Sequence, residues 1–323
     1  MGERTIITGA AGFVGANLAR RLLRDGHEVH VLALPSAWRL RDLAHDLHFH
    51  DVDVRDRERV GAAFHGIQPA WVFHLAAHGA YSDQRDPERI VHTNTLGCMS
   101  VLDASVDVGA AAFVQTGSSS EYGFCARAAS ERDPIAPNSV YAISKAAATH
   151  YCALIARSRG VHAVTLRLYS IYGPFEEPRR LIPTLLVYGR RGLLPPLVSP
   201  RTARDYVYVE DAVDALLRAA RSSGAPRGSV YNVCTGVQTN METIVERVRE
   251  DLRIPAKPVW ESMPARSWDT DIWVGDPSLM RSELGWTAAT ALREGLARTA
   301  AWLGESEERF ALYEARVSQA SRP

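Results

Sequence analysis

The sequence lacks the features that would place it in a membrane, on nucleic acid or in an oxidising compartment. It has only four cysteines in 323 residues, at 98, 125, 152 and 234. Their scattered spacing predicts reduced core thiols, no metal centre and a cytoplasmic location. No apolar run approaches the roughly 20 residues of a membrane helix, and no secretory signal pattern opens the chain. Lysine plus arginine equals aspartate plus glutamate, 37 against 37, so we expect neither nucleic acid nor a membrane surface as a partner.

What the chain does contain is an alternation of short apolar segments with helical patterns. Its length and its 46% hydrophobic content suffice for one large core domain and a smaller one. Alternation of this kind predicts an α/β fold with a parallel, doubly wound sheet. The predicted strands are Arg4–Thr8, His27–Leu34, Leu47–Asp53, Ala70–Ala77, Ala111–Gly117 and His162–Tyr169, and the predicted helices are Phe13–Asp25, Arg57–Phe64, Pro87–Val108 and Val140–Arg159.

A glycine-rich turn follows the first predicted strand. Gly9, Gly12 and Gly15 are spaced three apart, and Phe13 and Val14 open the helix that follows. Glycines let the turn tighten and let backbone N–H groups approach a pyrophosphate at a helix N-terminus. Loops collect glycines, so the triplet alone is weak evidence. Its place between a first strand and a helix predicts a dinucleotide-binding domain of the Rossmann type.

The second predicted strand ends without the acid that grips the adenosine ribose in NAD-binding domains. Ala33-Leu34 stands there, and Arg39 and Arg41 follow. Either arginine could hold the 2′-phosphate of NADP, or both could belong to a solvated basic loop. We expect NADP(H) to bind at least as well as NAD(H). Asp53-Val54 ends the third predicted strand, where the carboxylate could meet the adenine amine or lie in an ordinary exposed turn.

The second half of the chain changes character after Ser170. Six prolines between 174 and 200 punctuate short segments, and residues 257–286 are rich in tryptophan and proline. We expect residues 1–175 to form the cofactor-binding domain. Residues 176–323 are expected to form a smaller substrate lobe with returns to the main sheet, such as Ser229–Cys234.

Tyr141 and Lys145 lie four residues apart at the start of a predicted helix, and therefore on one helical face. A lysine ammonium beside a phenol lowers the pKa of the phenol, which can then take a proton from a sugar hydroxyl as hydride leaves the carbon. A serine at the end of a neighbouring strand, within Thr116–Ser120, is expected to polarise the same oxygen. Alone, the pair is a common chance match and the serine run reads as a polar turn. The glycine turn, the serine run and the pair in this order predict an enzyme.

With these motifs the chain resembles the extended short-chain dehydrogenase/reductases, the nucleotide-sugar epimerase/dehydratase group, over nearly its whole length. The motifs are TGAAGFVG at 8–15, DV at 53–54, HLAA at 74–77, Asn94, GSSSEYG at 117–123, YAISK at 141–145, LRLYSIYGP at 166–174 and RDYVYVEDAV at 204–213. The resemblance implies NAD or NADP as cofactor. It also implies Ser118 as the catalytic serine, Tyr141 as base or acid, and Lys145 at the nicotinamide ribose. The cofactor-binding residues expected are Gly9, Gly12, Phe13, Val14, Gly15, Arg39, Asp53, Val54, Leu75, Ala76, Ala77, Asn94, Tyr141 and Lys145.

The resemblance further implies a nucleotide-diphosphate sugar between the two lobes. Arg204 and Arg266 match positions that contact its pyrophosphate, and Arg180 is a third candidate. A guanidinium fork suits two phosphate oxygens, whereas a surface salt bridge is the alternative for each arginine. His78 and Tyr81 are expected to face the hexose or to pack in the core. The substrate-binding residues expected are His78, Tyr81, Ser119, Ser120, Ser170, Arg180, Arg204 and Arg266.

The residues after Ser118 bear on which reaction of the group to expect. The 4,6-dehydratases carry an acid pair there, whereas this chain has Ser119 and Ser120, with Glu121 one place too late and pointing differently. The sequence therefore disfavours a dehydratase. Of the two remaining reactions, the resemblance implies a 4-epimerase first, because that activity is the commoner one in the group. The alternative is an NADPH-dependent 4-ketoreductase for an NDP-4-keto-6-deoxyhexose, because GSSSEYG is similar to reductases of GDP-4-keto-6-deoxy-mannose. A dehydratase or a non-catalytic cofactor sensor is less expected, since the Tyr/Lys pair is present.

The predicted helices Pro87–Val108 and Val140–Arg159 carry apolar residues on more than one face, which calls for a second partner. The residues that suggest this are Val101, Leu102, Val106, Ala146–Ala148 and Leu154. The resemblance implies that these helices form a four-helix homodimer interface. The alternative is that one chain buries both faces.

Overall fold

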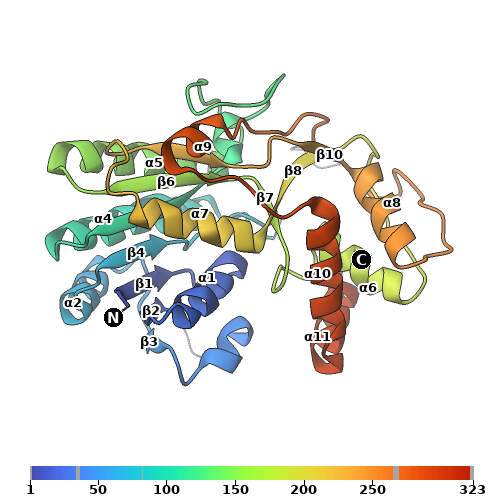
Figure 1. Ribbon diagram of the computed structural model, residues 1–323, viewed down its shortest axis with the longest axis horizontal. Coiled ribbons are helices and arrows are strands. Elements are labelled where there is room, and N and C mark those ends of the chain that lie inside the picture. The colour runs from blue at the N-terminus through green and yellow to red at the C-terminus, as the bar shows by residue number, and fades with distance from the viewer. Residues whose placement is uncertain (1, 34–36, 82, 265–268, 321–323) are drawn as a thin grey trace.

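A seven-stranded parallel sheet forms the centre of the larger part of the molecule (Figure 1). The computed structural model describes residues 2–33, 37–81, 83–264 and 269–320. The strand order is β3-β2-β1-β4-β5-β6-β9, which confirms the predicted doubly wound Rossmann-type sheet. The strands are β1 (Arg4–Thr8), β2 (Glu28–Leu32), β3 (His48–His50), β4 (Trp71–His74), β5 (Ala112–Ser118), β6 (Ala163–Leu168) and β9 (Val230–Val233).

Helices cover both faces of this sheet and bury its apolar strands. One face packs against α1 (Phe13–Arg24), α7 (Val209–Arg221) and α9 (Ser278–Leu284), through side chains such as Leu18 and Leu216. The other packs against α2 (Arg57–Ile67), α4 (Gly97–Asp107) and α5 (Val140–Arg159). Because both faces are covered, successive residues of a central strand such as Ile6 and Ile7 are both fully buried.

A π-helical turn interrupts the predicted helix Pro87–Val108. The structure has α3 (Pro87–Val91), the π turn η2 (His92–Leu96) and α4 in one helical run. Asp86 begins the run by accepting hydrogen bonds from two first-turn N–H groups, and Pro87 occupies the first position, where its missing N–H costs nothing. Such π turns often mark functional sites, and this one carries Asn94.

A smaller three-stranded sheet, in the order β10-β8-β7, lies beside the main sheet (Figure 1). It consists of β7 (Ser170–Tyr172), β8 (Ala203–Tyr208) and β10 (Gln238–Asn240). The helices of this lobe are α6 (Leu181–Arg190), α8 (Met241–Asp251), α10 (Leu292–Gly304) and α11 (Glu307–Ala320). Buried side chains that include Leu185, Ile244 and Tyr313 form its core. The chain returns to the main sheet at β9, which pairs in parallel with β6.

Several strands are shorter than predicted, and β4 shows the reason. The prediction ran to Ala77, but the strand ends at His74. Leu75 N still donates to Thr8 O, whereas Ala76 N donates to the side-chain oxygen of Thr8. A side chain thus replaces the strand partner, and the backbone is free to turn along the edge of the sheet.

The apolar residues that suggested a second face on the long helices are mostly buried within the chain. Val101, Leu102, Ala146 and Ala148 are at most 5% exposed. That part of the argument for a dimer was wrong, because α4 and α5 pack against the sheet and each other. Three other apolar side chains of these helical segments are exposed: Leu154 at 57%, Ile143 at 53% and Leu96 at 46%.

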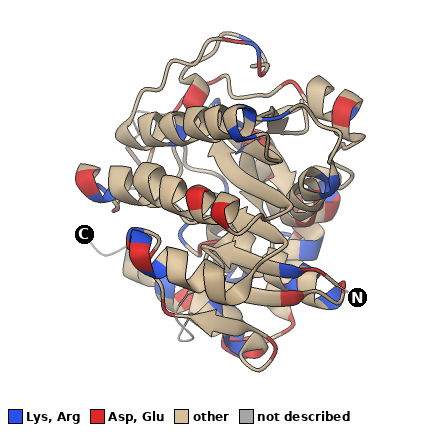
Figure 2. Ribbon diagram, turned by 90° about the vertical axis from the view of Figure 1, so that its left-hand side faces the viewer, with Lys and Arg blue, Asp and Glu red and all other residues tan. Residues whose placement is uncertain are grey.

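Acidic and basic residues are interspersed along the ribbon in Figure 2, in keeping with the balanced charge. Among the described residues, no helix combines the length and the apolar character needed to cross a bilayer.

Candidate active site

The glycine turn is fixed by how closely other backbone segments approach it. Gly9 has a φ of +72°, and a Cβ there would lie 2.5 Å from Ala76 N at the end of β4. A Cβ on Gly15 would lie 2.4 Å from Gly9 O. Side chains at either position would push β1, β4 and α1 apart, so the glycines are needed for this geometry.

The turn leaves the N-terminus of α1 open. Gly12 is the N-cap and provides no side-chain cap, and the first turn contains no acidic residue. Phe13 and Val14 begin the helix directly after it. Unpaired N–H groups and the positive end of the helix dipole favour an anion. This cradle, which a Cβ at Gly9 or Gly15 would fill, fits the pyrophosphate of a dinucleotide.

The segment after β4 is anchored by a buried histidine that the sequence analysis did not single out. Thr8 Oγ1 lies 2.8 Å from His74 Nδ1 and accepts a hydrogen bond from Ala76 N. Burial, with the Lys145 charge as a smaller cause, lowers the pKa of His74 to about 3. A neutral His74 therefore holds Leu75–Ala77 against the glycine turn rather than acting in acid–base chemistry.

Asn94 ties the next part of this segment to α5. Its side chain accepts from His78 N and donates to His78 O and to Ser144 Oγ, at 2.7, 2.8 and 2.9 Å. The π turn directs this buried side chain inward. Asn94 therefore positions the backbone at His78.

Ser118 and Tyr141 come together at the carboxyl edge of the sheet. Ser118 ends β5, and Ser139 begins α5 by accepting a hydrogen bond from Ala142 N, which places Tyr141 in the first turn. A side-chain hydrogen bond with Ser118 lowers the pKa of Tyr141, but burial raises it more, to about 12. Ser118 Oγ also accepts from Ser120 N.

The effect of Lys145 on the Tyr141 phenol stays a prediction. The charge of Arg180 lowers the pKa of Tyr141 against the larger effect of burial. Burial lowers the pKa of Lys145, whereas the charge of Glu121 raises it. Lys145 is 3% exposed, and no hydrogen bond or ion pair joins its ammonium to another described residue. A buried ammonium of this kind has donors to offer a ligand.

Glu121 is turned into the core behind Ser118. Its carboxylate accepts from Ser118 N and Thr149 Oγ1, and it forms a buried ion pair with Arg167 at 2.9 Å. The same carboxylate closes a capping box on η3 (Ser119–Tyr122). Glu121 therefore supports the backbone at Ser118, and its oxygens are already bonded.

Arg204 lies beside Trp273 on the substrate-lobe side. The guanidinium is 5.1 Å from the centre of the Trp273 ring and bonds to Asp269 at 3.2 Å. Trp273 Nε1 donates to Ser119 Oγ. These contacts join the serine run of the main sheet to β8 of the smaller one. Arg204 is half-buried, with its guanidinium over the Trp273 ring and paired with Asp269.

Arg180 is the cation shared by a group of tyrosines. Its charge lowers the pKa of Tyr81, Tyr141 and Tyr206, although burial raises each of these values overall. Its Nε lies 3.7 Å from Glu176 Oε1. The second oxygen of Glu176 is buried without a hydrogen-bond partner, and burial raises the pKa of this carboxyl group to about 8.

The arginine expected at a 2′-phosphate has other partners. Arg39 is buried, and its guanidinium donates to Phe175 O and to Glu177. Arg41 is exposed. Asp53 accepts hydrogen bonds from the backbone N–H and the guanidinium of Arg55 in an exposed turn, while Val54 is buried beneath Gly97.

Ser170 and Arg266 are the two remaining residues expected to bind substrate. Ser170 begins β7 and pairs with Tyr206 of β8. Arg266 lies outside the described residues.

Trp273, Tyr206 and Glu176 were missed by the sequence analysis. Trp273 lies four residues after Asp269, in the tryptophan-rich segment, and Tyr206 lies within the quoted motif at 204–213. Neither a tryptophan nor a tyrosine in these positions forms a sequence pattern that indicates a binding site. Glu176 follows Pro174 by two residues, and only tertiary burial makes its carboxyl group unusual.

A glycine cradle at a helix N-terminus, beside a serine and a Tyr/Lys pair at the carboxyl edge of a doubly wound sheet, defines a nucleotide-dependent enzyme of the Rossmann class. The chain belongs to the NAD-dependent epimerase/dehydratase family, which its sequence matches over residues 5–234.

Curated relatives and solved structures agree with this assignment. The chain is 31% identical to a UDP-glucose 4-epimerase of Mycolicibacterium smegmatis, covering 92% of this chain and 97% of the relative. It is also 31% identical to a dTDP-glucose 4,6-dehydratase of Streptomyces griseus, covering 94% of each. The crystal structure of UDP-glucose 4-epimerase with UDP-glucose from Thermotoga maritima superposes with a TM-score of 0.85 at 26% identity, covering 93% of this chain and 98% of that one. The protein is thus an NAD-dependent enzyme of nucleotide-sugar epimerase/dehydratase type.

Proposed function

We propose that this chain is a nucleotide-sugar 4-epimerase that transiently oxidises C4 of an NDP-hexose with a tightly bound nicotinamide cofactor. In this proposal residues 1–175 bind the cofactor and residues 176–323 bind most of the sugar nucleotide. The named relatives include both an epimerase and a dehydratase, so the choice between the two reactions has to come from the site.

The observation that carries the choice is the set of groups directly after Ser118. Ser119 and Ser120 have no carboxylate, and Ser119 Oγ already accepts from Trp273. Glu121, the nearest acid along the chain, is bound by Arg167, Thr149 and a backbone N–H. None of these three residues is arranged to remove a C5 proton or to expel a C6 hydroxyl. A 4-epimerase requires neither step.

The proposed chemistry needs one proton carrier and one polarising group. Tyr141 takes the proton of the C4 hydroxyl and returns it after the sugar has turned over. Ser118 donates a hydrogen bond to the same oxygen and so stabilises the negative charge that develops on it. Arg180 opposes the effect of burial on the phenol, because its charge favours the phenolate.

The glycine cradle, Leu75–Ala77 and Lys145 would hold the cofactor. The Lys145 ammonium has no hydrogen bond to another of the described residues, so its donors are available to the ribose hydroxyls. Asn94 shapes the adjoining segment. When bound, the nicotinamide supplies the hydride acceptor and donor that reversible oxidation at C4 requires.

Arg204 and Arg180 are proposed to hold the diphosphate, and His78 and Tyr81 to face the hexose. A guanidinium binds two phosphate oxygens with good geometry. Arg204 keeps donors beyond its bonds to Asp269 and Ala203 O. Trp273 and Tyr206 lie near these arginines and offer apolar surface to the rest of the ligand.

Product analysis by ¹H NMR tests this function. The full-length protein is incubated with UDP-glucose, and in a parallel sample with dTDP-glucose, without added cofactor. We expect the C4 epimer to accumulate to an equilibrium mixture and its formation to stop in Ser118→Ala. A 4-keto-6-deoxy sugar as the product would show a dehydratase instead.

A 4-ketoreductase that uses exchangeable NADPH is the second candidate. It is favoured by Ala33, which directly follows β2 and lacks the carboxylate that would repel a 2′-phosphate. Since Arg39 is engaged by Glu177, Arg41 is the better placed phosphate ligand. Losing such a contact costs about 1.5–3 kcal/mol, so calorimetry should show weaker NADP(H) binding in Arg41→Ala and unchanged NAD(H) binding.

The proposed assembly is a homodimer through the outer faces of α4 and α5 and the helical turns before α4. Leu96, Ile143 and Leu154 are each about half exposed or more, although they lie on helices that also pack on the sheet. A second copy of the same helix pair would cover them, as expected for a two-fold interface.

A further inference from the structure

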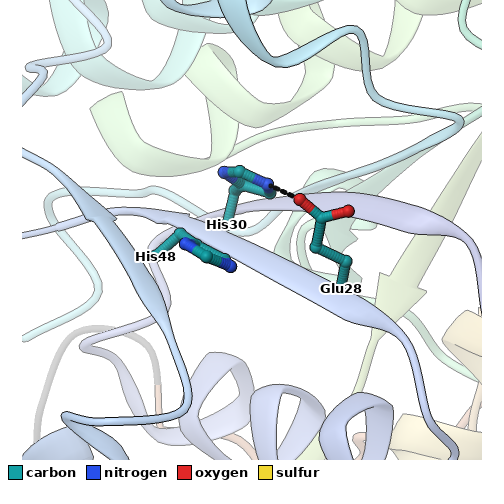
Figure 3. A group of neighbouring side chains, drawn as sticks. All are labelled: Glu28, His30 and His48. Atoms are coloured by element: carbon teal, nitrogen blue, oxygen red, sulfur yellow. Dashed lines mark hydrogen bonds and ion pairs between the residues drawn. The ribbon is translucent and has the colours of Figure 1, made fainter.

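Three histidines and a glutamate share one face at the outer edge of the main sheet. Glu28 and His30 belong to β2, and His48 and His50 to the edge strand β3. Strand pairing sets His30 opposite His48 and Leu32 opposite His50. Because side chains alternate along a strand, all four residues project from the same face. Figure 3 shows Glu28, His30 and His48 gathered there.

The side chains are in contact through their polar atoms. His30 Nε2 lies 2.9 Å from Glu28 Oε1, and His30 Nδ1 lies 2.9 Å from His50 Nε2. The His48 ring stacks on His30 with centroids 4.6 Å apart. One potential ligand atom from each of Glu28, His30 and His48 falls within 4.8 Å of the other two.

This spacing is close to that of a tetrahedral metal site. Two ligands bound at about 2.1 Å to one zinc ion lie roughly 3.4 Å apart. His30 is buried, whereas the exposed side chain of His48 can rotate to bring a ring nitrogen closer to it. Glu28 is bonded to Arg4 with Oε1 already 2.9 Å from His30 Nε2, so His48 is the ligand that has to move.

The surroundings of the cluster prepare two of its ligands. Arg4 donates to Glu28 Oε2 and leaves Oε1 directed at His30. His50 can accept the Nδ1 proton of His30, which frees Nε2 as a ligand, and such outer partners orient ligating histidines.

We propose that Glu28, His30 and His48 bind one divalent transition-metal ion of the zinc class across β2 and β3. Imidazole and carboxylate donors suit Zn²⁺, whereas Mg²⁺ and Ca²⁺ require oxygen ligands. The ion clamps β3, which has three residues, to its neighbour, and a water completes the coordination. No sequence motif indicated this site because its ligands come from two strands, with His30 and His48 eighteen positions apart.

Calorimetric titration of Zn²⁺ tests the site in the untagged, full-length protein after dialysis against EDTA. We expect one ion per chain. We also expect zinc-edge X-ray absorption to show only nitrogen and oxygen ligands, including imidazole. His48→Ala and Glu28→Gln should bind at least 10-fold more weakly, since each loses one ligand of three. His50→Ala should bind about 10–100-fold more weakly, because it removes an orienting partner.

His65→Ala is the matched control. His65 is an exposed histidine on α2 that bonds to Gly61 O, and its loss should leave affinity and stoichiometry unchanged. Zn²⁺ should also raise the melting temperature of the wild type, and at the same concentration it should raise that of His48→Ala by less.

Three results would overturn the proposal: no saturable binding by the wild type, wild-type affinity in both His48→Ala and Glu28→Gln, or sulfur among the ligands. Circular dichroism in EDTA verifies that each variant is folded. None of these readouts uses a nucleotide sugar, so they do not depend on the function proposed above.

Discussion

Tyr141 is the residue on which the proposed chemistry depends most directly. Replacing it with phenylalanine removes only the hydroxyl that transfers the proton. We expect turnover of Tyr141→Phe to fall by about 10²–10⁴-fold, while the fold and cofactor binding persist. Steady-state kinetics and cofactor titration measure the two effects. Tyr151→Phe, on the same helix but bonded to Asp103, is the control and should keep its rate. A near wild-type rate for Tyr141→Phe would remove this residue from its role.

Glu176 predicts a pH dependence of stability. Burial raises its pKa in the folded protein from 4.5 to about 8, so folding favours the protonated form. The stabilisation is complete below pH 4.5, where the unfolded chain is also protonated, and it is lost as the pH rises through 8. Between pH 5 and 8 the free energy of unfolding of the wild type should therefore fall by about 2–4 kcal/mol on account of this group.

Urea denaturation at pH 5 and 8 checks this prediction. Glu176→Gln, which cannot ionise, should lose that slope and be the more stable protein at pH 8. Glu242→Gln changes an exposed glutamate of α8 and should keep the wild-type slope. An unchanged slope in Glu176→Gln would show that this carboxyl group is ionised in the folded protein.

Single site residues could be predicted from the sequence where they follow a regular spacing along the chain. Ser118, Tyr141 and Lys145 form a pattern along the chain, so the sequence could name them. It could not show that the Glu121 carboxylate is already bonded to Arg167 and Thr149, because that depends on where each side chain turns. Trp273 and Ser119 are 154 positions apart and meet only through the fold.

Among the elements, the turn between β1 and α1 is the most sensitive to substitution. Gly9→Ala places a Cβ 2.5 Å from Ala76 N in a backbone with φ of +72°. We expect a loss of stability of about 1–2 kcal/mol from the left-handed backbone and, in addition, a displaced cradle that no longer binds cofactor. Gly26→Ala is the matched control, with φ of +81° and no atom within 4 Å of the new Cβ. Calorimetry with NAD should show lost binding in the first variant and retained binding in the second. Equal affinity in both would mean that the close approach at Gly9 does not shape the cofactor site.

Element type and order followed from hydrophobic periodicity, but ends and irregularities did not. The strand β4 is shorter than predicted because Thr8 supplies a side-chain acceptor at Ala76, and periodicity carries no information on such a bond. The π turn at His92–Leu96 likewise depends on side-chain hydrogen bonds that periodicity does not encode. One extra residue in a turn is accommodated because Asn94 bonds to His78, in the segment after β4, and to Ser144 on α5.

For the whole molecule, the proposed homodimer makes a prediction about mass. Leu154→Asp puts a charge on the outer face of α5 in each copy, and burying it unpaired is costly. Sedimentation at micromolar concentration should show a dimer for the wild type and a monomer for this variant. Leu193→Asp, at another exposed leucine, should remain dimeric. A monomeric wild type would end the proposal.

The fate of the hydrogen on C4 tests the central claim most directly. The purified protein, without added cofactor, is given UDP-glucose deuterated at C4 in ordinary water, and the product is analysed by NMR and mass spectrometry. Because a 4-epimerase returns the same hydride to the same carbon, we expect a C4 epimer that keeps deuterium at C4. Deuterium at C6 of a 4-keto-6-deoxy product, or loss of deuterium to a freely exchanging cofactor, would contradict it.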